Sequence, residues 1–218
     1  MVRNPGNSWR RSSPSRRQLR ERVAETAAKL LYEGKFKEFI DAKKTAAQDL
    51  GPDSLPSNLE VALKLLETAL EAEGEEYWRR LRRLRETALK LMETLRKFNP
   101  RLVGSVWRGV VKPGSDIDIE VDWENPPEIV ETLKKAGYMV KDVEPVNVPE
   151  PLRIGSLWKI KLEIDGLEAE VILKEHEAYL NPPPCPIYGD PRKGLSLSEL
   201  RKLLERDPER LFIPRRNP

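Results

Sequence analysis

The stretch from residue 102 to 123 constrains the fold of this chain more than any other part of the sequence. It contains a Gly104-Ser105 pair and, ten residues later, a run from Asp116 to Asp122 in which acidic residues alternate with Ile or Val. This alternation has the period of two that is typical of a β-strand with one buried face. Such a strand needs a sheet around it and a covering layer on one side, so this part of the chain cannot be all-helical.

The 218-residue chain changes character near Asn99. Before that residue, apolar positions recur every three or four residues, which predicts helices that include 36–50 and 75–98. After it, short alternating runs and a hairpin turn at Asp165-Gly166 predict a mixed sheet of four or five strands with flanking helices. We therefore expect an α+β fold in four segments: a disordered basic tail (1–17), a helical N-terminal domain (18–99), a catalytic domain (100–180) and a C-terminal loop, short helix and tail (181–218).

The first 22 residues carry seven arginines and one acidic residue, although the formal net charge of the chain is only +3. Two interpretations of this basic start are open: a solvated tail, or an arm that contacts nucleic acid, because clustered arginines neutralise phosphates. Cys185 is the only cysteine, and no segment has the ~20 apolar residues of a membrane span. We expect a cytoplasmic protein without membrane contact. The many Glu, Lys and Arg residues are typical of a thermophile.

Asp116 and Asp118 are two residues apart on the predicted strand, so both side chains project from the same face. Carboxylate oxygens suit Mg²⁺, which is commonly held by one or two carboxylates together with substrate phosphates. A site for two metal ions, about 3.5–4 Å apart, would need a third carboxylate from a neighbouring strand. Glu168 and Glu170 share one face of the predicted last strand, and we favour Glu170 because the apolar run of residues 171–173 follows it.

The Gly-Ser pair predicts a phosphate-binding turn. Gly104 lets the backbone approach a phosphate closely, and Ser105 supplies a hydroxyl and a backbone N–H. Arg108 is three residues further along the chain and can pair with a phosphate through two N–H groups. Lys112 is a second candidate cation. Ser115 directly precedes the first aspartate of the strand, where it can orient that carboxylate or contact a phosphate.

These residues resemble the signature of the polymerase-β-like nucleotidyltransferase superfamily, and in particular its minimal nucleotidyltransferase branch. The resemblance rests on a hydrophobic residue before Gly104-Ser105, a ten-residue spacer, and Asp116 and Asp118 on a hydrophobic strand. It implies transfer of a nucleoside monophosphate from an NTP to a hydroxyl acceptor, with release of pyrophosphate. It also implies that the Gly-Ser turn binds the triphosphate, and that the three carboxylates bind two Mg²⁺ ions, with Mn²⁺ as an alternative. The third acid of the family is usually Asp, whereas this chain offers Glu170.

The resemblance, which extends to predicted nucleotidyltransferases of archaea, makes ATP the expected NTP. It leaves the acceptor open among RNA, protein and small molecules, and it leaves open whether the protein is a monomer or a homodimer. A second function belongs to another class: a catalytically inactive nucleotide- or RNA-binding module with the same fold. Glu170 in place of Asp and the basic N-terminal tail favour this alternative.

Several side chains outside the signature also carry predictions. Glu120 and Asp122 extend the acidic face of the strand and are expected to be solvated. The arginines within 79–85 are expected on a solvated helix face, paired with glutamates of the same helix. His176, the only histidine, is expected at the surface. Tyr188 lies in a turn-rich segment that we hypothesise to form a lid or to stack on the nucleotide base.

Overall fold

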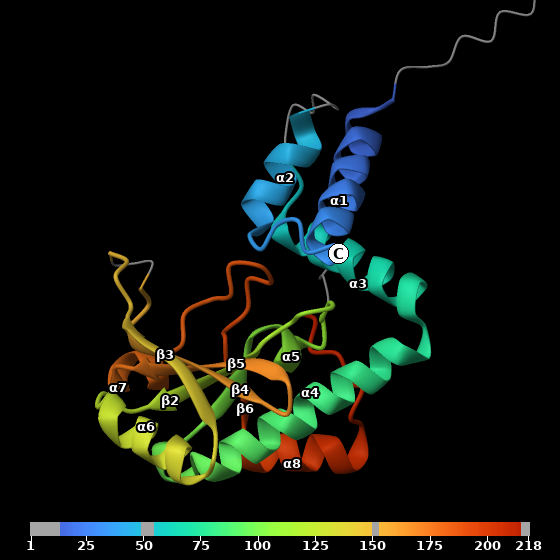
Figure 1. Ribbon diagram of the computed structural model, residues 1–218. Helices are drawn as coiled ribbons and strands as arrows, with labels where there is room; N and C mark the ends of the chain where they lie inside the picture. Colours follow the sequence, from blue (N-terminus) through green and yellow to red (C-terminus); the bar gives the residue numbers. More distant parts are fainter. Residues whose placement is uncertain (1–13, 49–54, 150–152, 215–218) are drawn as a thin grey trace, which may run out of the picture.

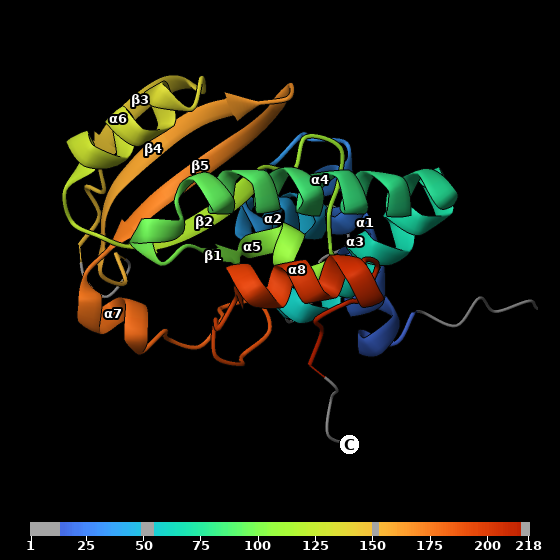
Figure 2. The ribbon, with the colours of Figure 1, turned by 90° about the horizontal axis from the view of Figure 1, so that it is seen from below.

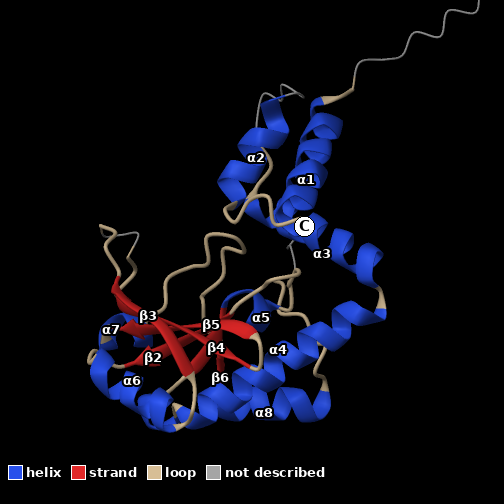
Figure 3. Ribbon diagram, in the orientation of Figure 1, coloured by secondary structure: helices blue, strands red, loops and turns tan. Residues whose placement is uncertain are grey.

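The computed structural model describes residues 14–48, 55–149 and 153–214. Its elements, in chain order, are α1 (Arg16–Tyr32), α2 (Phe39–Gln48), α3 (Asn58–Glu73), α4 (Glu75–Thr94), the 3-10 turn η1 (Arg96–Phe98), β1 (Arg101–Val103), α5 (Gly104–Arg108), β2 (Ile117–Asp122), α6 (Pro126–Lys135), β3 (Met139–Pro145), β4 (Ser156–Ile164), β5 (Leu167–Lys174), α7 (His176–Leu180), β6 (Leu195–Ser196) and α8 (Leu197–Arg206). Helices α1–α3 gather on one side of the molecule, and the long helix α4 connects them to a mixed sheet (Figures 1 and 3).

The N-terminal helices begin at well-formed caps. The side chains of Ser15 and Ser57 each accept a hydrogen bond from the backbone N–H three residues later, and Gln18 and Glu60 complete these capping boxes. α1 packs against α2 and α3 mainly through buried alanine, valine and leucine side chains. Arg20 of α1 forms an ion pair of 2.6 Å with Glu60 of α3, so these helices form a packed unit.

Within the described residues, six strands form one sheet in the order β3-β4-β5-β2-β1-β6. β2 and β5 are parallel, and the other neighbours are antiparallel. The two-residue strand β6 makes this sheet larger than the four or five strands expected from the sequence. Figure 2 shows α4, α6 and α8 on one face of the sheet, whereas the opposite face is turned toward the loops that precede β6 and the side of α1–α3.

The alternation predicted for residues 116–122 is present in β2. The Ile and Val side chains of this strand are fully buried beneath the covering helices, and Ile119 lies opposite Val171 of β5 in the parallel ladder. The acidic residues between them therefore project from the other face. In the same ladder Asp118 lies opposite Glu170, so two of the predicted carboxylates are neighbours across the strands.

The arginines of α4 form the solvated face expected from the sequence only in part: Arg79, Arg82 and Arg83 are exposed, whereas Arg80 and Arg85 are not. Arg79 does pair with Glu76 of the same helix, at 3.0 Å. Arg83, in contrast, donates to the backbone oxygen of Asp165 at 2.8 Å, and Arg85 is fully buried. Because α4 packs against both the sheet and α8, most of its arginines pair with acceptors from other elements rather than with glutamates of α4.

Some predicted boundaries also shift. α1 begins at Arg16, within the segment expected to be a disordered tail, and residues 1–13 of that segment lie outside the described residues. α2 begins at Phe39 rather than residue 36. β3 ends at Pro145 and is an edge strand, as a proline in a strand requires. No helix in the described part of the chain is long and apolar enough to cross a membrane.

Candidate active site

The Gly-Ser turn lies directly against the first residues of β2. β1 ends at Val103, and Gly104 begins α5 with a backbone φ of +70°. A Cβ atom at residue 104 would overlap the carboxylate of Asp118, coming within 2.9 Å of its Cγ. Only glycine fits this position, because both the left-handed backbone and the carboxylate exclude a side chain. Ser105 follows in the first turn of α5, and its hydroxyl makes no hydrogen bond to another described residue.

The charges of three carboxylates interact where the neighbouring central strands β2 and β5 begin to pair. Asp116 immediately precedes β2, Asp118 is its second residue, and Glu170 lies opposite Asp118 on β5. Burial, together with the nearby charges of Asp116 and Glu170, raises the pKa of Asp118 to about 8. A nearby cation stabilises the charged form of such a buried carboxylate more than that of an exposed one. Strongly shifted pKa values of this kind are common in functional sites.

The structure separates the two candidate third acids. Glu170 is 19% exposed and forms an ion pair of 2.8 Å with Lys159 of β4. Glu168 is 60% exposed and pairs with Lys141 of β3, on the side away from β2. Glu170 is therefore the glutamate that shares a ladder position with Asp118.

The donor set fits a divalent cation that shares its coordination with a substrate. Asp116, Asp118 and Glu170 offer hard oxygen ligands, and the ammonium of Lys159 already stands as a cation against Glu170. Among the described residues, no three Asp, Glu, His or Cys side chains converge closely enough to hold a metal ion by themselves. Substrate phosphates would have to supply the remaining ligands, which is the usual mode for Mg²⁺.

The side chain of Arg108 does not pair with any of these three carboxylates. It is buried, with two guanidinium nitrogens 2.6 and 2.8 Å from the carboxylate oxygens of Asp190 and a further bond to the backbone oxygen of Phe212. Its guanidinium is also sandwiched between the rings of Trp107 and Tyr188, at 3.9 and 4.5 Å. The phosphate contact predicted for Arg108 would require this cluster to open. The stacking hypothesis for Tyr188 meets the same obstacle, and burial raises the pKa of this tyrosine.

Lys112 and Ser115 form the turn that leads into β2. The backbone N–H of Lys112 donates to the Ser115 hydroxyl at 2.9 Å, and the Ser115 N–H donates to the Lys112 carbonyl at 3.0 Å. Ser115 thus fixes the backbone next to Asp116, in line with the orienting role expected for it. The ammonium of Lys112 has no ion pair within the described residues.

The acidic face of β2 continues into a buried charge cluster that the sequence did not predict. Glu120, expected to be solvated, is only 2% exposed. Its carboxylate accepts from Arg101 at 3.0 Å and Arg192 at 3.1 Å, and Lys174 lies 3.9 Å away. The prediction was wrong because two arginines, one of them from the segment before β6, close over this part of the strand. The sequence signal for this cluster was Lys174, because a lysine directly after the apolar run of β5 indicates a buried acidic partner.

Asp122 is likewise covered rather than solvated. Its side chain is 14% exposed, and its carboxylate oxygens lie 2.9 and 3.0 Å from Nδ1 of His176, the first residue of α7. The His176 side chain is 67% exposed, which confirms the surface position expected for it. The two ends of β2 therefore differ: Asp116 and Asp118 face each other's charge, whereas Glu120 pairs with basic side chains and Asp122 bonds to the His176 ring.

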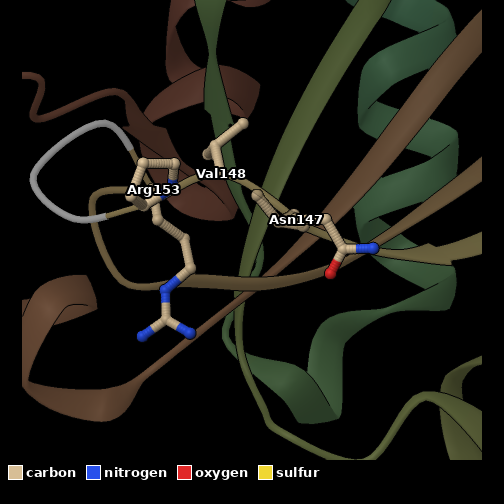
Figure 4. A pocket seen from close by; sticks show the side chains of 5 residues that line it. Asn147, Val148 and Arg153 are labelled. Carbon is tan, nitrogen blue, oxygen red and sulfur yellow. The ribbon is translucent and has the colours of Figure 1, made fainter.

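Two cavities in the described part of the chain lie away from the three carboxylates. One of about 570 Å³ is lined by the β3–β4 connection, with Asn147, Val148 and Arg153 around it (Figure 4). Another of about 460 Å³ is lined by Arg101 and Lys193, beside the Glu120 cluster. Neither is lined by the Gly-Ser turn or the three carboxylates.

Comparison with known families gives a match over the part of the chain that holds the three carboxylates. Residues 81–179, from α4 to α7, match the family model described as nucleotidyltransferase domain. The chain therefore carries a nucleotidyltransferase domain, in agreement with the polymerase-β-like superfamily that the sequence resembles. Such a domain implies binding of an NTP, and the family generally uses divalent metal ions. None of the curated proteins compared with the chain matches it.

Proposed function

We propose that this protein transfers a nucleoside monophosphate from an NTP to a hydroxyl acceptor, releases pyrophosphate and depends on Mg²⁺ or Mn²⁺. The observation that carries the proposal is the contact between the Gly104 turn and the Asp118 carboxylate, with Asp116 and Glu170 acting on the same group. A glycine turn against a carboxylate cluster suits a phosphate chain that approaches the backbone on one side and the acidic groups on the other.

Each residue has a defined task in this proposal. The backbone at Gly104 and the hydroxyl of Ser105 bind the triphosphate. Asp116, Asp118 and Glu170 hold the divalent ions, which when bound neutralise the charge of the transferred and leaving phosphates. One of these carboxylates also accepts the proton of the attacking hydroxyl. ATP is the proposed NTP, and the acceptor is an RNA, a protein or a small molecule that presents a hydroxyl.

The test uses the purified chain, Mg²⁺, each of four labelled NTPs and a cell extract that contains the acceptor. We expect one NTP to label a component of the extract, and we expect the variant with both Asp116→Ala and Asp118→Ala to label nothing. The matched control is Glu168→Ala, which removes the exposed glutamate that faces Lys141 and should keep the activity. Labelling that survives in the double variant would overturn the mechanism.

A second function, an inactive nucleotide-binding module, has two structural observations in its favour. Within the described residues the carboxylates do not converge into a metal site of their own, and Lys159 already neutralises Glu170. Calorimetric titration of the protein with ATP, with and without Mg²⁺, distinguishes the two functions. Binding that needs Mg²⁺ supports the enzyme, and equal binding without metal supports the module.

A further inference from the structure

Two basic side chains lie close enough to Asp118 to affect its ionisation: Lys159 of β4 and Arg192 of the segment before β6. Both lower the pKa of Asp118, against the larger effects of burial and of the neighbouring carboxylates. Arg192 is fixed by its bond to the buried Glu120. Lys159 differs, because its side chain is 37% exposed and Glu170 is its only ion-pair partner in the described part of the chain.

Lys159 and Lys161 are adjacent on one face of β4 but turn toward opposite neighbours. Nζ of Lys159 lies 2.8 Å from Oε2 of Glu170 on β5. Lys161 is directly opposite Glu170 in the ladder, yet its Nζ lies 2.6 Å from Oε1 of Glu144 on the edge strand β3. Of two lysines with nearly equal positions, only Lys159 bonds to a carboxylate of the proposed site.

The bond of Lys159 conflicts with the task proposed for Glu170. An ammonium within hydrogen-bond distance of Oε2 occupies space that a divalent ion on the same oxygen needs, and two cations so close repel each other. A lysine has a compact charge on a flexible four-carbon stem, so it can move several ångströms without a backbone change. When metal and NTP bind together, the triphosphate supplies a new group of negative charges beside this stem.

We propose that Lys159 is an exchangeable phosphate-binding residue, which holds Glu170 until a divalent ion binds that carboxylate and then binds the triphosphate of the NTP. This inference rests on the proposed function, since it assigns Lys159 to the same site. It also provides the site with a cation that can bind phosphate. Arg108, the arginine that follows the Gly-Ser pair in the sequence, is already paired with Asp190.

If Lys159 exchanges partners in this way, removing its charge should strengthen the binding of metal alone and weaken the binding of nucleotide with metal. Lys159→Met keeps the length of the side chain and removes its charge. We expect Mn²⁺ alone to bind this variant about threefold more tightly than wild type, because the competing ammonium is gone and a partly exposed ion pair is weak. We expect a non-hydrolysable ATP analogue with Mg²⁺ to bind about tenfold more weakly, because a charge-assisted bond to phosphate is lost. Isothermal titration measures both.

Lys161→Met is the matched control, because it removes the same charge from the same face of β4 and leaves the Glu170 ion pair in place. Both of its affinities should stay within about twofold of wild type. Lys159→Arg keeps the positive charge, so it should retain analogue binding and serves if the methionine variant does not fold. If wild type binds metal and analogue but Lys159→Met weakens both or changes neither, the inference on Lys159 is wrong and the proposed function stands. If wild type binds neither, both are wrong.

Discussion

Gly104 connects the phosphate turn to the carboxylates at the scale of a single residue. Its positive φ and the absence of a side chain let α5 begin against Asp118. Gly114 has an equally left-handed backbone, with a φ of +75°, but a Cβ there would meet nothing within 4 Å. Substitution of each glycine in turn therefore separates the free-energy cost of the backbone conformation from the cost of overlap with Asp118.

We predict that Gly104→Ala abolishes nucleotide binding and lowers the free energy of unfolding by about 3 kcal/mol, since strain and overlap add. Gly114→Ala should cost only about 1 kcal/mol, from backbone strain alone, and should leave binding unchanged. Urea denaturation and titration with an ATP analogue and Mg²⁺ measure the two effects. Equal losses in both variants would show that the contact of the turn with Asp118 has no special importance.

Sequence reasoning at this scale could predict contacts between near neighbours but not contacts with distant partners. Gly104 and Asp118 were identifiable because a turn and an alternating strand are local patterns. Arg108 and Glu120 were not, because Asp190 and Arg192 approach them from a segment more than 70 residues away. Nothing in the local pattern distinguishes an arginine that binds phosphate from one that meets an internal carboxylate.

At the scale of elements, α4 holds the sheet and the C-terminal segment together through a buried arginine. Arg85, expected on a solvated face, lies between Leu81 and Ala88 at helical spacing and is buried with them. Its guanidinium donates to four backbone oxygens, those of Val106, Trp107, Pro208 and Arg210. Because burial opposes its charge, the pKa of Arg85 falls to about 10, which still leaves it protonated at neutral pH.

We predict that Arg85→Met lowers the free energy of unfolding by about 3–4 kcal/mol, because it leaves buried carbonyl groups without donors. Arg82→Met is the matched control on the same helix. Its guanidinium is half exposed and pairs with the exposed Glu209, so its loss should cost less than about 1 kcal/mol. Urea denaturation of both variants provides the measurement. A difference below about 1 kcal/mol between them would contradict a structural role for Arg85.

At the scale of the whole molecule, the change from a helical to an alternating sequence pattern near Asn99 does not coincide with a boundary between two packed units. α4 lies before that point, yet it packs against β1, β2 and α8, and the family match already begins at residue 81. A helix pattern reveals which face is buried but not which partner covers it, so the sequence could not assign α4 to the sheet. The same limit applies to the residues after 181, whose loops and short helix close over β1 and β2.

Arg108 joins three distant parts of the chain at this scale. Its own helix α5 follows the Gly-Ser turn, Asp190 belongs to the segment before β6, and Phe212 lies beyond α8. The backbone N–H of Phe212 also donates to the Arg108 carbonyl at 2.9 Å, so the C-terminal segment is bound on both sides of this residue. The position of the Gly-Ser turn thus depends on residues as far as 104 positions from Arg108.

We predict that Asp190→Leu lowers the free energy of unfolding by about 2–3 kcal/mol, because it leaves the buried Arg108 charge without a partner. The double variant with Arg108→Met should recover at least half of that loss, since it removes the charge as well. Urea denaturation of the single and double variants gives the coupling between the two residues. Titration of the double variant with an ATP analogue and Mg²⁺ then tests the role first expected for Arg108. Affinity close to wild type means that Arg108 only positions α5, whereas a tenfold loss in the stably folded double variant means that its guanidinium leaves Asp190 to bind the triphosphate.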